Sequence, residues 1–115
     1  MCGLPGDSLV DGEGIVGTYV VNGIDPSGVE YSGTVTIAEA DAGYEIQWIV
    51  TGAVQLGQGQ LIGDTLDVEW ASVTDPRGDV SGTATYVVGA DGVLRGERIT
   101  NGVDGVGTEE IFPEP

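Results

Sequence analysis

Length and charge restrict the classes to which this chain can belong. Its 115 residues suffice for one domain with a modest core, and two domains are not expected. Nineteen acidic residues stand against three arginines, with no lysine and no histidine, so the formal net charge is −16. Such a body repels nucleic acid and anionic membrane surfaces, which argues against both as partners. No apolar run approaches the roughly 20 residues of a membrane-spanning helix.

The chain begins with a segment that we expect to be flexible, residues 1–12, ahead of a single domain over residues 13–115. Cys2 is the only cysteine, so neither an internal disulfide nor a thiolate metal cluster is expected. Two interpretations of Cys2 stay open. It is either an ordinary terminal residue or the lipid-bearing cysteine of an exported lipoprotein, followed by a polar tether over residues 5–8. The second interpretation places the protein outside the cytoplasm, at a cell surface.

The rest of the chain consists of short alternating segments separated by turn signals, a pattern typical of an all-β protein. In one of them Leu66, Val68 and Trp70 share a face, and polar side chains occupy the other. Asp25-Pro26-Ser27-Gly28 is a typical turn sequence between two such segments. The predicted strands are Gly14–Asn22, Val29–Ala38, Tyr44–Thr51, Val54–Ile62, Thr65–Ala71, Asp79–Val88, Val93–Thr100 and Val106–Phe112.

A weak internal repeat divides these strands into two four-strand halves. Ser32-Gly33-Thr34-Val35-Thr36 returns as Ser81-Gly82-Thr83-Ala84-Thr85, and an Asp-Pro turn occurs in each half. Every connection is short, so neighbours in sequence should pair as hairpins. An eight-stranded antiparallel up-and-down β-barrel, a meander without exposed edges, follows from these features. A β-sandwich is the alternative architecture.

Several short glycine-centred motifs resemble those of the calycin barrels, the group that includes lipocalins and avidins. They are Gly17-Thr18-Tyr19, Gly82-Thr83-Ala84 and Leu94-Arg95-Gly96-Glu97-Arg98. The progression Tyr31-Ser32-Gly33-Thr34 and Tyr44-Glu45-Ile46-Gln47-Trp48 also resembles small exported bacterial domains of unknown function. The calycin resemblance implies that an arginine of a late strand packs across an aromatic ring of the first strand. Arg98 and Tyr19 occupy those places here.

Aromatic side chains converge on the predicted interior of the barrel. An eight-stranded barrel has room either for its own side chains or for one small ligand, and both alternatives stay open. Tyrosine and tryptophan suit a mostly apolar pocket because each has one polar group. Glycines on the same faces, at positions 17, 33, 82, 96 and 107, are expected to leave volume unfilled. The candidate ligand-binding rings are Tyr19, Tyr31, Tyr44, Trp48, Trp70 and Tyr86.

Two charged residues share the inward parity of their strands, Arg98 and Glu109. A buried arginine needs a partner, so we expect Arg98 to meet Glu109, an aromatic face such as Tyr19, or both. This pair is either a latch that closes the barrel or a part of ligand recognition. Both residues therefore belong to the candidate site.

Catalysis is not expected, because the chain has no histidine base and no glycine-rich phosphate loop ahead of a helix. No loop has the dense aspartate spacing of a calcium site, and no metal or cofactor is expected. Arg77-Gly78-Asp79 resembles an integrin-binding tripeptide but is also ordinary turn chemistry.

The leading hypothesis is an exported, non-enzymatic barrel, extracytoplasmic or at a cell surface, that binds a small apolar or aromatic molecule in its interior. The alternative is an interaction or structural module with a filled core. Outward apolar side chains at Val16, Val20, Ile49 and Val87 would then form a protein-binding surface or a homodimer face.

Overall fold

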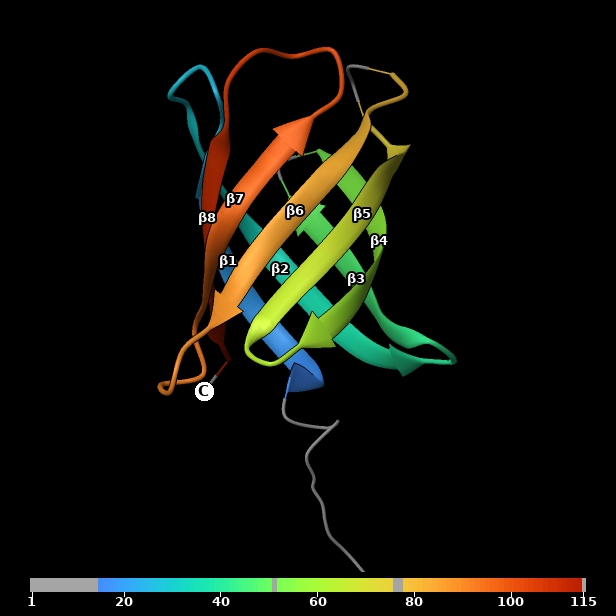
Figure 1. The fold of residues 1–115 in the computed structure, drawn as a ribbon. Coiled ribbons are helices and arrows are strands. Elements are labelled where there is room, and N and C mark those ends of the chain that lie inside the picture. The colour runs from blue at the N-terminus through green and yellow to red at the C-terminus, as the bar shows by residue number, and fades with distance from the viewer. Residues whose placement is uncertain (1–14, 51, 76–77, 115) are drawn as a thin grey trace, which may run out of the picture.

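A computed structural model describes residues 15–50, 52–75 and 78–114. These residues form a closed antiparallel barrel in which each strand pairs with its sequence neighbours and the last strand pairs with the first (Figure 1). The predicted up-and-down barrel is confirmed, and the sandwich alternative is wrong. In the described part of the chain, no helix has the length and apolar character needed to cross a bilayer. The strands are β1 (Gly17–Ile24), β2 (Glu30–Ala40), β3 (Gly43–Val50), β4 (Ala53–Ile62), β5 (Thr65–Thr74), β6 (Ser81–Val88), β7 (Leu94–Thr100) and β8 (Gly107–Pro113).

Several sequence-based expectations concern residues outside the described ranges. These are the flexible segment 1–12, the two interpretations of Cys2, and Arg77 of the Arg-Gly-Asp tripeptide. The predicted first residue of one strand, Gly14, and the predicted last residue of another, Thr51, also lie there.

β1 closes the ring because it has a partner on each side. Its last residue, Ile24, pairs with Glu30 of β2 and with Thr108 of β8, so β1 continues beyond its predicted end. Ile15 precedes the strand and is buried. The Tyr19 hydroxyl donates a hydrogen bond of 2.7 Å to the Ile15 carbonyl, which fastens this entry segment to the barrel.

β5 also continues further than predicted, to Thr74 rather than Ala71. One extra residue, Val73, lies opposite the step from Val54 to Gln55 of β4, where the register shifts. This irregularity has the form of a β-bulge, which keeps both strands paired while it bends the edge of the barrel.

The two ends of the barrel differ. We call one the loop end; it carries the connections β1–β2, β3–β4, β5–β6 and β7–β8, at the top of Figure 1. The opposite end carries the other three hairpins and both ends of the described chain. The hairpin of β2 and β3 projects beyond the wall there.

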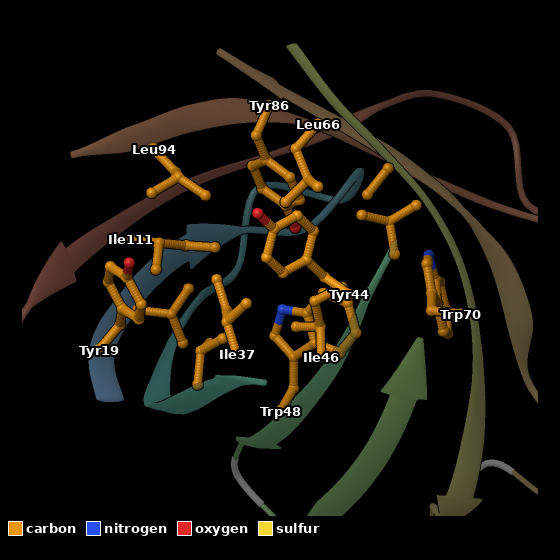
Figure 2. Close-up of a cluster of buried hydrophobic side chains, with 14 of the residues drawn as sticks. Tyr19, Ile37, Tyr44, Ile46, Trp48, Leu66, Trp70, Tyr86, Leu94 and Ile111 are labelled. Atoms are coloured by element: carbon orange, nitrogen blue, oxygen red, sulfur yellow. The ribbon is translucent and has the colours of Figure 1, made fainter. Parts of the chain in front are cut away.

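Apolar side chains of alternate residues fill the interior (Figure 2). Trp48, Tyr86 and Leu94 are each at most 1% exposed, so the middle of the barrel is packed solid. Burial of such side chains contributes roughly 1.5–3 kcal/mol each. The expectation that the six rings lie within the wall of the barrel is met, although Tyr31 is only half-buried.

Glycines of the inner face bring strands together rather than leaving space. A Cβ at Gly33 would collide with the carbonyl oxygen of Ile49, and one at Gly82 with the carbonyl oxygen of Ile99. The expectation that these glycines leave volume unfilled is therefore wrong at both positions. The two contacts occupy corresponding places in the β2–β3 and β6–β7 pairs, which agrees with the two halves of the internal repeat.

Candidate functional site

A buried ion pair joins the last two strands near the loop end. Nη1 of Arg98 on β7 lies 2.9 Å from Oε2 of Glu109 on β8, and the two side chains are 8% and 0% exposed. Both side chains point inward as predicted. Taking two charges out of water costs several kcal/mol per ion, so the site needs further hydrogen bonds to be stable.

Two tyrosines supply those bonds to the carboxylate. On the inner face, Tyr31, Gly23, Glu109, Gly96 and Tyr86 are consecutive cross-strand neighbours from β2 through β1, β8 and β7 to β6. The Tyr86 hydroxyl donates to Oε1 at 2.6 Å, and the Tyr31 hydroxyl donates to Oε2. A Cβ at Gly23 would collide with the Tyr31 ring, so a bare backbone lets this tyrosine reach across β1.

The guanidinium of Arg98 has its other contacts with β3, β4 and β5. Its Nη2 donates to Oε1 of Gln55 at 2.7 Å. Its Cζ lies 4.1 Å from the ring centroid of Trp70 and 4.9 Å from that of Trp48, which is within cation–π range. The predicted meeting with Glu109 is confirmed. The predicted contact with an aromatic face is also confirmed, but the faces are those of Trp48 and Trp70. Tyr19, the ring named as an example, bonds to the entry segment at the opposite end of the barrel.

The surroundings keep the two tyrosines of this network protonated and its arginine charged. Burial, followed by the charge of Glu109, raises the pKa of Tyr31 and of Tyr86 above the ordinary value near 10. Burial lowers the pKa of Arg98, but the charge and hydrogen bonds of Glu109 and the tyrosines raise it by more. At neutral pH the tyrosines are donors and the arginine is a cation.

A hollow of about 310 Å³ opens above this network at the loop end. Arg98, Gln55 and Trp70 form its floor, because their strands carry them inward below the loops. Two carboxylates, Asp25 and Asp75, belong to the turns around its mouth. The complete lining is Asp25, Pro26, Tyr31, Val50, Ala53, Gln55, Trp70, Asp75, Arg98, Thr100 and Gly107.

Asp25 is charged at neutral pH. Its Oδ1 accepts hydrogen bonds from the Ser27 hydroxyl at 2.6 Å and from the Ser27 and Val29 amides at 2.9 and 3.0 Å. The Ser27 hydroxyl first, and then the Val29 amide, lower the pKa of this carboxyl below its ordinary value. The mouth of the hollow is therefore negative.

The structure brings most of the predicted site residues together and separates two. Tyr19 lies toward one side of Figure 2 and Trp70 toward the other, and Tyr44 belongs to the packed core rather than to the lining of the hollow. The polar cluster contains Tyr31, Trp48, Trp70, Tyr86, Arg98 and Glu109.

Gln55 is a site residue that sequence reasoning missed. It is 3% exposed and bonds to Arg98. The signal was a polar residue on the same parity as Gly57 and Gly59 in the predicted strand at 54–62. Val54 and Leu56, on the other parity, are apolar, so the sequence did not show which face of this strand is the inner one.

The groups of the network that border the hollow are hydrogen-bonding and aromatic. Among the described residues there is no group of three metal-ligating side chains. Glu109 accepts three hydrogen bonds and is closed off from the hollow by its donors. What faces the hollow is a guanidinium edge, an amide and part of an indole, which are recognition groups.

Comparisons with known proteins agree with the architecture. The chain matches no protein-family model and no curated protein sequence. It is similar to a redesigned beta barrel, b11L5F_LGL, with a TM-score of 0.73, 14% identity and coverage of 90% of this chain and 95% of that one. It is also similar to a redesigned beta barrel, mFAP1, bound to DFHBI, with a TM-score of 0.71, 14% identity and coverage of 90% and 97%. At this identity the similarity concerns the fold alone.

Proposed function

We propose that this protein is a non-enzymatic binding barrel that holds one small aromatic molecule in the hollow at its loop end. The observation that carries the proposal is the floor of that hollow. There an arginine and a glutamine, which a purely structural core would replace with apolar side chains, lie beside a tryptophan and line a space of about 310 Å³. Ligand pockets in proteins begin at roughly this size.

The ion pair beneath the hollow is costly to bury. A buried pair is often no more stabilising than well-packed apolar residues of the same volume. Stability alone therefore gives little reason to place Arg98 and Glu109 inside a small barrel. Recognition of a ligand through the exposed edge of Arg98 supplies such a reason, and it explains why the pair lies under the hollow rather than in the middle of the core.

Two further considerations support the proposal. The core below the network is filled with buried side chains, whereas Arg98, Gln55 and Trp70 border open space at the loop end. A barrel of the same architecture, mFAP1, is bound to DFHBI, although nothing in a 14% identity transfers that molecule to this chain. The calycin resemblance fits the same proposal, with Arg98 facing the rings of Trp48 and Trp70 instead of the first strand.

Filling the hollow tests the proposal. Ala53 lines the hollow and is buried, so Ala53→Leu should abolish a saturable quench of tryptophan fluorescence by a library of small aromatic molecules. Ala71→Leu makes the same change on the exposed outer face of β5 and should leave the quench unchanged. Absence of any saturable quench in the unmodified protein, or a quench that survives Ala53→Leu, would contradict the proposal.

A second candidate function is an interaction module that forms a homodimer. Val20 of β1 pairs with Phe112 of β8 and Thr34 of β2, and Ile49 of β3 pairs with Thr34 and Val54 of β4. Along one line the outer face is thus uncharged across five strands. We use the name outer row for Phe112, Val20, Thr34, Ile49 and Val54.

The outer row favours self-association because it lacks the carboxylates that make other faces repel one another. The other expected outward residues, Val16 and Val87, are also exposed. Val87 pairs with Thr65 and Arg95, away from the row. Sedimentation should give a dimer that Ile49→Glu converts to a monomer. A monomer at all protein and salt concentrations would remove this candidate.

A further inference from the structure

The floor of the hollow determines which chemical class of ligand it accepts. Guanidinium groups only donate hydrogen bonds, so the Gln55 atom 2.7 Å from Nη2 of Arg98 must be the carbonyl oxygen. The amide nitrogen of Gln55 is consequently turned to the other side. It donates to no residue that the structure describes, although the Gln55 side chain is only 3% exposed and lines the hollow.

The arginine adds further donors to the same floor. Of its five N–H groups, the described contacts of Arg98 use one on each terminal nitrogen, toward Glu109 and Gln55. The floor therefore presents donors from two side chains. A ligand that displaces water from these donors must supply acceptors in its place, because each buried donor left unsatisfied typically costs about 1–3 kcal/mol.

Charge then selects among the acceptors. The positive charge of Arg98 is already matched by Glu109 at 2.9 Å. The carboxylate of Asp25, whose described partners are a hydroxyl and two amides rather than a cation, lines the mouth above it, in a chain of net charge −16. An anionic ligand meets repulsion at this mouth and in the field of the whole chain, and a cationic ligand meets donors at the floor that it cannot satisfy.

We propose that the ligand is an uncharged planar molecule whose carbonyl-type oxygen accepts hydrogen bonds from Gln55 and Arg98. Its apolar ring lies against Val50, Ala53 and the edge of Trp70, and its oxygen points down into the barrel. This inference rests on the proposed function and narrows it to one class. The bulge at Val73, opposite the step into Gln55, is the local irregularity beside this glutamine.

Three probes of one planar shape separate the alternatives: benzamide, benzoate and benzamidine. Benzamide offers a neutral carbonyl oxygen, benzoate an anionic acceptor, and benzamidine a cation that only donates. Binding is followed by NMR through the Gln55 side-chain amide and the Trp70 indole N–H. Benzamide should bind roughly ten-fold more tightly than either analogue at low salt, and benzoate should gain when salt screens the mouth.

A matched pair of variants tests the glutamine. Gln55→Glu keeps an acceptor for Arg98 but removes the amide donor, so benzamide affinity should fall roughly ten-fold. Gln58→Glu adds the same charge to the outer face of the same strand and should leave the affinity within about two-fold.

The outcomes are distinguishable. Benzoate or benzamidine binding as tightly as benzamide, or a Gln55→Glu variant that binds benzamide normally, would overturn this inference while the proposed function stands. If none of the three probes shifts the Gln55 and Trp70 resonances, the hollow does not hold small aromatic molecules and the proposed function fails with it.

Discussion

Changing Glu109 to glutamine should destabilise the barrel by about 3–5 kcal/mol, because it leaves the buried guanidinium of Arg98 without its counter-charge. The substitution keeps the shape of the side chain. It also keeps one oxygen for the two tyrosine hydroxyls, which have freedom to turn. The loss is therefore electrostatic rather than a loss of packing. For a domain of this size, roughly 4 °C of melting temperature corresponds to each kcal/mol, so the midpoint should fall by about 12–20 °C.

The second half of the experiment removes the arginine. Arg98→Met alone should also be costly, because the Glu109 charge is then unpaired. In the double variant R98M/E109Q the network is neutral: the glutamine oxygen accepts from one tyrosine and its amide donates to the other. Methionine retains favourable contact with the rings of Trp48 and Trp70.

The double variant should therefore be less destabilised than the sum of the two single variants by at least about 2 kcal/mol. Urea unfolding followed by circular dichroism measures all four proteins of the cycle. Two results would refute the reasoning. One is a single variant within about 1 kcal/mol of the unmodified protein, and the other is a double variant whose loss equals the sum.

Three more expectations can be measured on the same protein. The raised pKa values of Tyr31 and Tyr86 mean that these tyrosines ionise first in the unfolded chain, so their contribution to stability should be constant from neutral pH to about pH 10 and fall above it, by up to about 1.4 kcal/mol per pH unit for each tyrosine. Denaturant unfolding with tyrosinate absorbance measures this loss, and a flat profile above about pH 10 would contradict it. Gly33→Ala should lower the free energy of unfolding by well over about 2 kcal/mol, because the new Cβ overlaps the Ile49 carbonyl oxygen. Gly63→Ala should lower it by about 1–2 kcal/mol, because Gly63 has open space around it and only its φ of 64° disfavours alanine; equal losses in thermal unfolding would contradict the packing explanation. Raising the salt concentration from low to about 1 M should raise the melting temperature, because it screens the repulsion among the carboxylates of a chain of net charge −16, and calorimetry that shows no change would contradict this.

Strand parity accounts for much of what the sequence predicted correctly. The eight strands, their hairpin pairing and the inward direction of Arg98 and Glu109 follow from a period of two and short connections. These are local properties of the chain. The ring closes through one further pairing, β1 with β8, which gives every strand two neighbours and leaves no exposed edge.

Contacts across the barrel could not be predicted in the same way. Which rings face Arg98 depends on the tilt and stagger of the strands, which parity does not determine. The rings proved to be Trp48 and Trp70 from distant strands, not Tyr19. Gln55 was missed because apolar residues lie on both faces of its strand. A ligand space in the interior was one of the open alternatives, but its place at the loop end was not predicted, because the inner-face glycines were expected to supply the volume.

The closed ring also divides cleanly in two. Cutting the chain at Gly63, between β4 and β5, yields two four-strand halves, each with an unpaired strand at both edges. The edges of one half, β1 and β4, pair with the edges of the other, β8 and β5. The Tyr31–Glu109 and Gln55–Arg98 bonds both cross between these halves. Reassembly of the two fragments would therefore rebuild the polar cluster, and any molecule held above it would act as a bridge between them.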